Sequence, residues 1–118
     1  MLDMLKVTIN DVEKTLRPSI SALRKIEDTL KMSIGEIGQA LQLGKVSTSL
    51  IVETVFYGIQ AAGESATRAD IEKHLEENGL DSLNEALVRF FLTATLGKVR
   101  AGEVLIQLQA DQAQTQEA

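Results

Sequence analysis

The hydrophobic and polar positions of this chain follow two periods, that of a strand and that of a helix. The strand period covers residues 5–10. Apolar and polar side chains alternate there, as they do in a half-buried strand. Asn10 and Asp11 have turn chemistry, and a returning strand is expected to end before Pro18, which lacks the amide hydrogen that strand pairing needs. The pattern predicts a hairpin over residues 5–17 that packs on helices, because two strands alone are marginally stable. The returning strand is expected over residues 14–17, and the alternative is a helix over residues 11–17.

From Ser19 onward the apolar positions follow the helical period, and the helix boundaries are marked by residue type. Ser, Thr or Asp stand where helices are expected to begin, and single glycines stand where they are expected to end. Ser33 and Glu36 also have the spacing of a capping box. The five predicted helices begin at or beside Ser19, Ser33, Ser47 or Thr48, Thr67, and Asp81 or Ser82, and the last four end at Gly44, Gly63, Gly79 and Gly97.

The stretch from Ser49 to Ala62 is apolar on nearly every side. A helix of this kind has to be covered by neighbours in most directions, so it is predicted to be the central core helix. It is too short to cross a bilayer, which needs about 20 apolar residues. The large side chains expected in the core are Leu50, Ile51, Val52, Val55, Phe56, Tyr57 and Ile59.

These patterns predict a mainly α protein, a compact bundle of about five short helices with a small N-terminal hairpin. Residues 1–97 are assigned to one domain, with the helices over residues 19–97, and residues 98–118 to a C-terminal segment. That segment is expected to be disordered from about residue 111, because its Gln- and Ala-rich sequence offers nothing to bury. Before that point stand four aliphatic residues that either dock on the bundle or wait for a partner: Val104, Leu105, Ile106 and Leu108.

Composition excludes several kinds of chemistry. The 118 residues include no cysteine, so a disulfide, a thiolate metal site and a cysteine nucleophile are ruled out. His74 is the single histidine, and it is expected to be a solvated side chain on an acidic helix surface. The sequence therefore predicts no enzyme, no cofactor and no metal site. A net charge of −5 argues against a nucleic-acid partner, and no secretion signal or membrane segment is evident.

A helix-turn-helix is the alternative interpretation of residues 34–56. Two short helices around a turn at Gly44, with a Ser/Thr-rich start to the second, have the expected form. However, the helix that would read DNA carries Glu53 as its only charge, whereas base recognition needs Arg, Lys, Asn or Gln. Two capped helices that meet at a glycine explain the pattern better.

A series of short motifs between residues 5 and 97 carries a family resemblance. The hairpin ends in Leu-Arg, an Ala-Leu-x-x-Ile-Glu helix follows, and the next helix opens with Ser-Ile. A central apolar helix ends in Ala-Gly, an acidic helix comes next, and the last helix ends in Leu-Gly. The motifs occupy residues 16–17, 22–27, 33–34, 62–63 and 96–97. In this order and spacing the chain resembles the tail assembly chaperone family of long-tailed phages, in the branch that includes the gene-transfer-agent tail proteins. Pro18 and the lack of glycine in the hairpin turn depart from the family pattern.

The resemblance implies a non-catalytic assembly factor without a cofactor. Members bind the tape measure protein, a long apolar helical polypeptide, and keep it soluble until tail tube subunits polymerise around it. The tail tube protein is the expected second partner, and the place of action is the bacterial host cytoplasm rather than the finished particle. The cargo contact is assigned to Val104, Leu105, Ile106 and Leu108. A minor tail or tail tube component is the alternative within the class, and a helix-turn-helix regulator is the alternative outside it.

Overall fold

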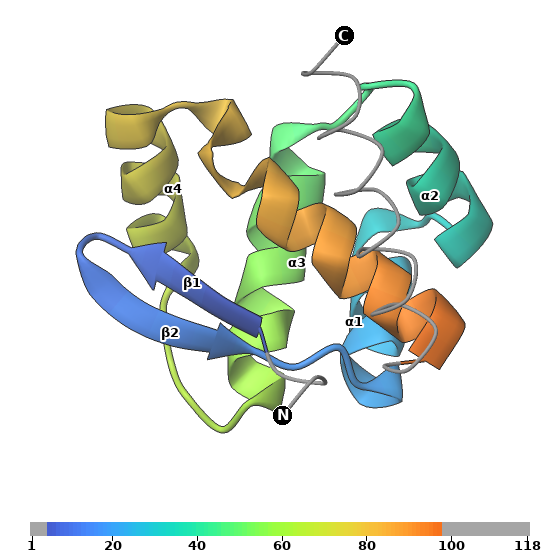
Figure 1. Ribbon diagram of the computed structural model, residues 1–118, viewed down its shortest axis with the longest axis horizontal. Coiled ribbons are helices and arrows are strands. Elements are labelled where there is room, and N and C mark those ends of the chain that lie inside the picture. Colours follow the sequence, from blue (N-terminus) through green and yellow to red (C-terminus); the bar gives the residue numbers. More distant parts are fainter. Residues whose placement is uncertain (1–4, 98–118) are drawn as a thin grey trace, which may run out of the picture.

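The computed structural model describes residues 5–97, and these residues are mainly helical. The order is β1, β2, α1, α2, α3, α4, a 3₁₀ turn η1 and a last helix over residues 84–97, which is orange and unlabelled in Figure 1. The predicted mainly α fold with a small N-terminal hairpin is confirmed. The predictions made for residues 98–118, including the aliphatic contact and disorder from residue 111, lie outside the described residues.

The hairpin is built from β1 (Leu5–Ile9) and β2 (Val12–Leu16), which pair antiparallel with Leu5 opposite Leu16. Its two-residue turn places both Asn10 (φ 52°) and Asp11 (φ 67°) in the left-handed region. Asn and Asp tolerate this region better than other residues with side chains, so the turn forms without glycine. The predicted hairpin is therefore confirmed, with a return strand that begins earlier than expected, and the helical alternative is wrong.

The predicted helix starts are also found. Each of Ser19, Ser33, Ser47 and Thr67 accepts a hydrogen bond from the backbone N–H three residues later, and Ser33 and Thr67 complete capping boxes. The last helix is the exception, because a 3₁₀ turn precedes it where a helix start at Asp81 or Ser82 was predicted. The bounds are α1 Ile20–Leu30, α2 Ile34–Gln42, α3 Thr48–Ala61, α4 Arg68–Asn78 and η1 Leu80–Leu83.

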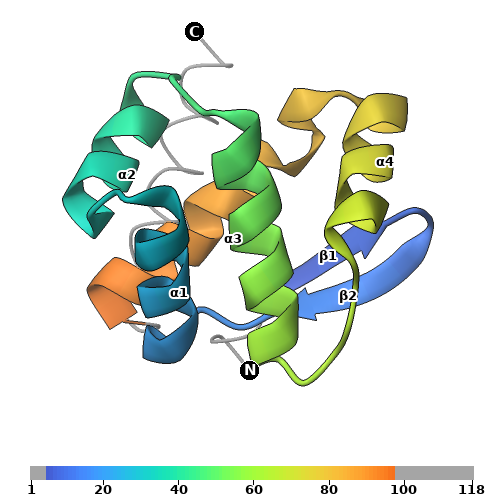
Figure 2. The ribbon, with the colours of Figure 1, turned by 180° about the vertical axis from the view of Figure 1, so that it is seen from behind.

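Helix α3 lies in the middle of the molecule. Figures 1 and 2 show α1 and α2 on one side of it, α4 on the other, and the last helix crossing it. Helix α3 contacts α1, β2 and α4. Its buried residues are Leu50, Ile51, Val52, Glu53, Thr54, Val55, Gly58 and Ile59. The prediction of a central helix covered on most sides is therefore confirmed.

The two aromatic residues of α3 differ from the prediction. Phe56 and Tyr57 are only partly buried, whereas Phe90 and Phe91 of the last helix are buried and pack edge to face with ring centroids 5.2 Å apart. Phe56 was expected in the core because it belongs to the most apolar stretch. In the structure the side of α3 that bears it is covered by Arg68 rather than by an apolar helix face.

Three elements meet at Gly58 of α3. The Arg17 amide of the chain leaving β2 donates to the Gly58 carbonyl over 3.0 Å. A Cβ atom at this position would lie 3.0 Å from Leu16 Cδ2 and 3.1 Å from Phe90 Cε2. The hairpin and the last helix can therefore approach α3 this closely because residue 58 has no side chain.

Candidate functional site: an apolar groove beside the last helix

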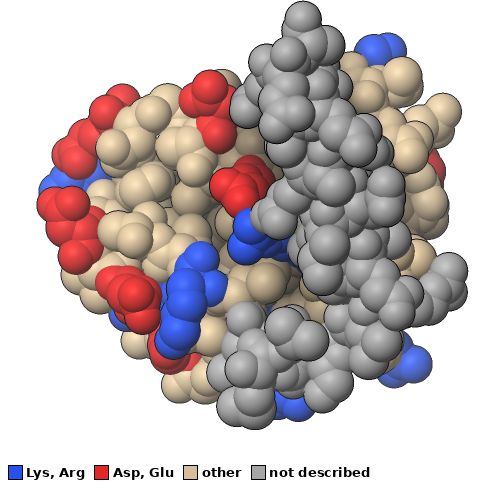
Figure 3. Space-filling view, viewed as in Figure 1, with Lys and Arg blue, Asp and Glu red and all other residues tan. Residues whose placement is uncertain are grey.

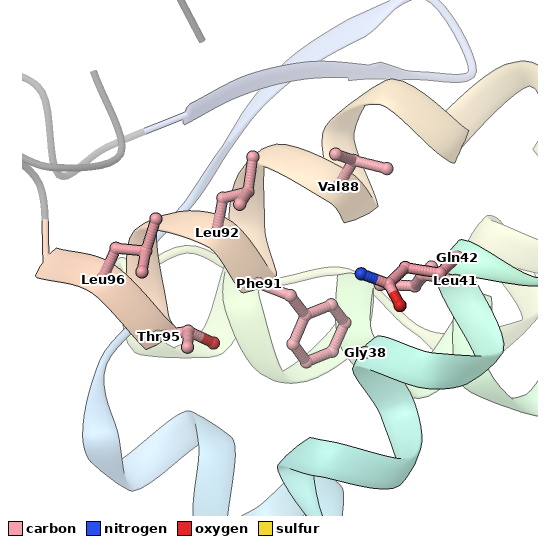
Figure 4. A pocket seen from close by; sticks show the side chains of 8 residues that line it. All are labelled: Gly38, Leu41, Gln42, Val88, Phe91, Leu92, Thr95 and Leu96. Atoms are coloured by element: carbon pink, nitrogen blue, oxygen red, sulfur yellow. The ribbon is translucent and has the colours of Figure 1, made fainter. Parts of the chain in front are cut away.

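An apolar groove of about 400 Å³ lies between α2 and the last helix. Positions 38, 41 and 42 belong to one face of α2, and positions 88, 91, 92, 95 and 96 belong to one face of the last helix, since residues three, four, seven or eight apart share a face. Figure 4 shows Phe91 pointing from the last helix toward α2, with Val88, Leu92 and Leu96 in a row along the helix. We call this site the apolar groove; its lining is Gly38, Leu41, Gln42, Val88, Phe91, Leu92, Thr95 and Leu96.

The α2 side of the groove includes a glycine at position 38. A Cβ atom at Gly38 would meet no atom of residues 5–97 within 4 Å, so within this part of the chain the missing side chain leaves free space rather than a tight contact. Phe91 is only 5% exposed and forms part of the core, whereas Val88 is 40% exposed. Leu41, Leu92 and Leu96 are partly buried. Phe91 therefore connects the groove to the core, and the aliphatic side chains beside it are accessible.

The lining of the groove is mainly apolar and carries no charge. None of its eight lining residues is charged, and its polar side chains are Gln42 and Thr95. Exposed acidic side chains of α4 are Glu72, Glu76 and Glu77, and Figure 3 shows acidic groups on the side of the molecule where α4 lies. A pocket of this kind can bury apolar side chains.

A second cluster joins α3 to α4 through an ion pair. The Glu53 carboxylate is buried on α3 and accepts from Arg68 Nε and Nη2, both at 2.8 Å. Hydrogen bonds to this carboxylate raise the pKa of Arg68 above its ordinary value. The guanidinium also lies 4.2 Å from the centre of the Phe56 ring and donates to the Tyr57 hydroxyl over 3.3 Å. The cluster satisfies a buried charge and holds two helices together, which is a structural role.

His74 is not the solvated side chain that the sequence predicted. It is 8% exposed, and its Nδ1 accepts from the backbone N–H of Asn10 over 3.1 Å. The Asn10 side chain donates to the Asp70 carbonyl over 2.9 Å. The expectation was wrong because the hairpin turn covers the face of α4 that bears His74. The available signal was its spacing, three residues after the inward Ile71, which places both on one face.

The structure also removes the surface on which the helix-turn-helix interpretation depends. In that interpretation α3 would enter the major groove of DNA with its side chains against base edges. Residues 50–55 of α3 are instead all buried within the protein.

Other kinds of site are not found among residues 5–97. No group of three His, Asp or Glu residues there is placed to hold a metal ion. No helix in this range has the length and apolar character that a bilayer span requires. The predicted contact residues Val104, Leu105, Ile106 and Leu108 follow the described residues, so their role stays a prediction. The groove was missed because its two walls are 50 residues apart in sequence (Gly38 and Val88) and no local pattern pairs them.

Comparison with protein families identifies the class of protein. The family model described as "Phage tail tube protein, GTA-gp10" matches residues 4–98. The chain belongs to this family. It is therefore a tail protein of the phage and gene-transfer-agent type, and the predicted tail association is confirmed at this level. No match was found among curated proteins or among solved structures.

The family membership covers the whole of the described fold. The match spans the hairpin, the four labelled helices and the last helix, and so both walls of the groove belong to the family region. Phage tail tube families are generally non-enzymatic. For this tail protein, action as an assembly chaperone and binding of the tape measure protein stay predictions.

Proposed function

We propose that this tail protein is a non-catalytic assembly chaperone that holds apolar helical segments of the tape measure protein in its groove. The observation that carries the proposal is an uncharged groove, formed by two helix faces, on a member of a phage tail family. An amphipathic helix docks into such a groove through anchors three, four and seven residues apart. Val88, Leu92 and Leu96 present a row with matching helical spacing.

The rest of the molecule suits a carrier of apolar cargo. A long apolar polypeptide aggregates unless its surface is covered, and a carrier must remain soluble while it covers that surface. The chain has a net charge of −5, and exposed carboxylates of α4 lie away from the groove lining. Like-charged carriers repel one another, which keeps loaded complexes apart. The proposed place of action is the bacterial host cytoplasm, before the tail tube protein assembles around the tape measure protein.

Co-expression with the tape measure protein tests this function. The expected result is that the tape measure protein becomes soluble and co-purifies with the chain. Gly38→Leu should abolish this effect, because the new side chain enters free space in the groove. Gly35→Leu is the matched control, since it adds the same side chain to the same helix at an exposed position outside the groove. A tape measure protein that stays insoluble with the parent chain contradicts the proposal.

A charge placed in the groove gives an independent version of the test. Val88→Glu should weaken capture of the cargo, because binding would bury the new carboxylate against an apolar helix. Ile20→Glu is the control, since Ile20 is 64% exposed on α1 and does not line the groove. Equal loss in both variants would place the cargo site somewhere other than the groove.

The family description favours one second candidate, a component of the tail tube itself. The two candidates differ in where the protein is at the end of assembly. A chaperone is absent from purified tails, whereas a tube or minor tail component is retained in fixed proportion. Mass spectrometry of purified particles therefore separates them.

A further inference from the structure

The apolar groove leaves aliphatic surface open among the described residues, and the chain continues beyond it. The last helix, which forms one wall, reaches Gly97, and 21 residues follow it (118 − 97). Gly97 has φ +80°, the left-handed conformation that ends a helix and turns the chain away from its axis. Leu96, the neighbour of this turn, lines the groove. The following segment thus starts at one end of the groove.

The distances allow this segment to return along the groove. Six residues, 98–103, separate Gly97 from Val104. Extended, they span at most about 20 Å, since each residue contributes about 3.3–3.6 Å. From Val88 to Leu96 the wall is only about 12 Å long, at about 1.5 Å per helical residue. The aliphatic residues can therefore reach any position in the groove.

The chemistry of the two partners also agrees. Residues 104–110 read Val-Leu-Ile-Gln-Leu-Gln-Ala and contain no charge, as the groove lining contains none. Leu105 and Leu108 are three residues apart, and Val104 and Leu108 are four apart, the spacing with which a helix offers anchors to a groove. The charged residues Glu103 and Asp111 stand on either side of this neutral stretch in the sequence.

We propose that residues 104–108 occupy the apolar groove of the free protein and that a cargo helix has to displace them. The docking of residues 104–108 is argued from the groove and the segment alone. Their displacement by a cargo helix rests on the proposed function. A groove covered by its own chain is closed to a second copy and to unrelated apolar peptides. Only the molecules whose groove is free can then bind cargo, so the apparent affinity for cargo falls in proportion to the fraction of free grooves.

Thiol reactivity tests the docking without any cargo. The chain contains no cysteine, so Thr95→Cys places a single reporter in the groove lining, and Thr8→Cys places one on the exposed surface of β1. The reporters are compared in the full chain, with and without Leu105→Glu plus Leu108→Glu. Gln107→Glu plus Gln109→Glu is the control pair, since it adds the same charge to the same segment at polar positions. Melting curves confirm that each variant is folded.

The expected result is that Leu105→Glu plus Leu108→Glu accelerates modification at position 95 by about tenfold or more, which corresponds to only about 1.4 kcal/mol of docking. The control pair should leave this rate unchanged, and the rate at position 8 should be the same in all backgrounds. An unchanged rate at position 95 would overturn the proposal. Protection that grows with protein concentration would also overturn it, because a second copy would then be the occupant.

Titration with a tape measure peptide completes the test. Displacement predicts tighter binding by the Leu105→Glu plus Leu108→Glu variant, since its groove is empty. Weaker binding would show that these residues contact the cargo, and the competition would be refuted. If position 95 is protected but no variant binds the peptide, the docking stands and the proposed function fails.

Discussion

At the scale of single residues, the core depends on where an aromatic side chain lies rather than on how apolar its neighbours in sequence are. Phe90 is completely buried, and its ring packs against α3 at Gly58, where the missing side chain makes room for it. Phe56 lies in the most apolar stretch of the chain and yet is only partly buried, with the Arg68 guanidinium over its ring. The two phenylalanines should therefore respond differently to truncation.

Phe90→Ala is expected to lower the free energy of unfolding by about 3–5 kcal/mol, because it leaves a cavity in the core. Phe56→Ala should cost roughly 1 kcal/mol, the usual size for a partly exposed site. Urea unfolding midpoints of both variants, measured against the parent protein, provide the comparison. Equal losses would show that the two rings are equally buried in solution.

At the scale of elements, the sequence predicts the helices better than it predicts how they meet. Ser33, Ser47 and Thr67 mark helix starts because capping is local chemistry between residues three apart. The hairpin was likewise predictable from alternation and from Asn10 and Asp11. What could not be predicted depends on contacts between distant segments. The burial of His74, the position of Phe91 and the groove all require knowing which faces the fold brings together.

The contact between the hairpin and α4 gives a test at this scale. His74→Phe keeps a ring of similar size but removes the acceptor for the Asn10 amide, which leaves a donor without its partner. The expected loss is about 1–3 kcal/mol in unfolding free energy, the usual penalty for such a group. Amide exchange measured by NMR should show Asn10 losing protection, whereas Glu77→Ala, an exposed change on the same helix, should leave it unchanged. Continued protection of Asn10 in His74→Phe would mean that this hydrogen bond does not hold the turn.

At the scale of the whole molecule, carboxylates that accept backbone hydrogen bonds connect stability to pH. The Thr15 amide donates to Glu64 and lowers the pKa of that carboxyl below its ordinary 4.5. The Thr67 amide does the same for Asp70, whose ordinary value is 3.8. Both groups bind protons more weakly in the folded state than in the unfolded state. Their contribution is therefore complete above the ordinary values and is lost as the pH falls through the lowered ones.

The melting temperature is accordingly expected to fall as the pH is lowered from about 6 to 3, the range in which such carboxylates are protonated. The melting temperature of Glu64→Gln should be lower at neutral pH and should fall less steeply as the pH is lowered, since a glutamine cannot titrate. Glu72→Gln, an exposed position on α4, serves as the control. A Glu64→Gln curve parallel to that of the parent protein would contradict the assigned role of the Thr15 hydrogen bond.

The empty position at Gly38 has a consequence for how this tail protein can change over generations. A glycine inside a helix costs about 1 kcal/mol relative to alanine. A Cβ atom at this position would meet none of the described residues within 4 Å, so alanine fits there. Every single-nucleotide change that replaces the glycine by another amino acid adds a side chain, and alanine there also favours α2. A single base change can therefore narrow the groove, and the change to alanine would also stabilise the protein. A lineage that no longer needed an occupant would be expected to lose this glycine early.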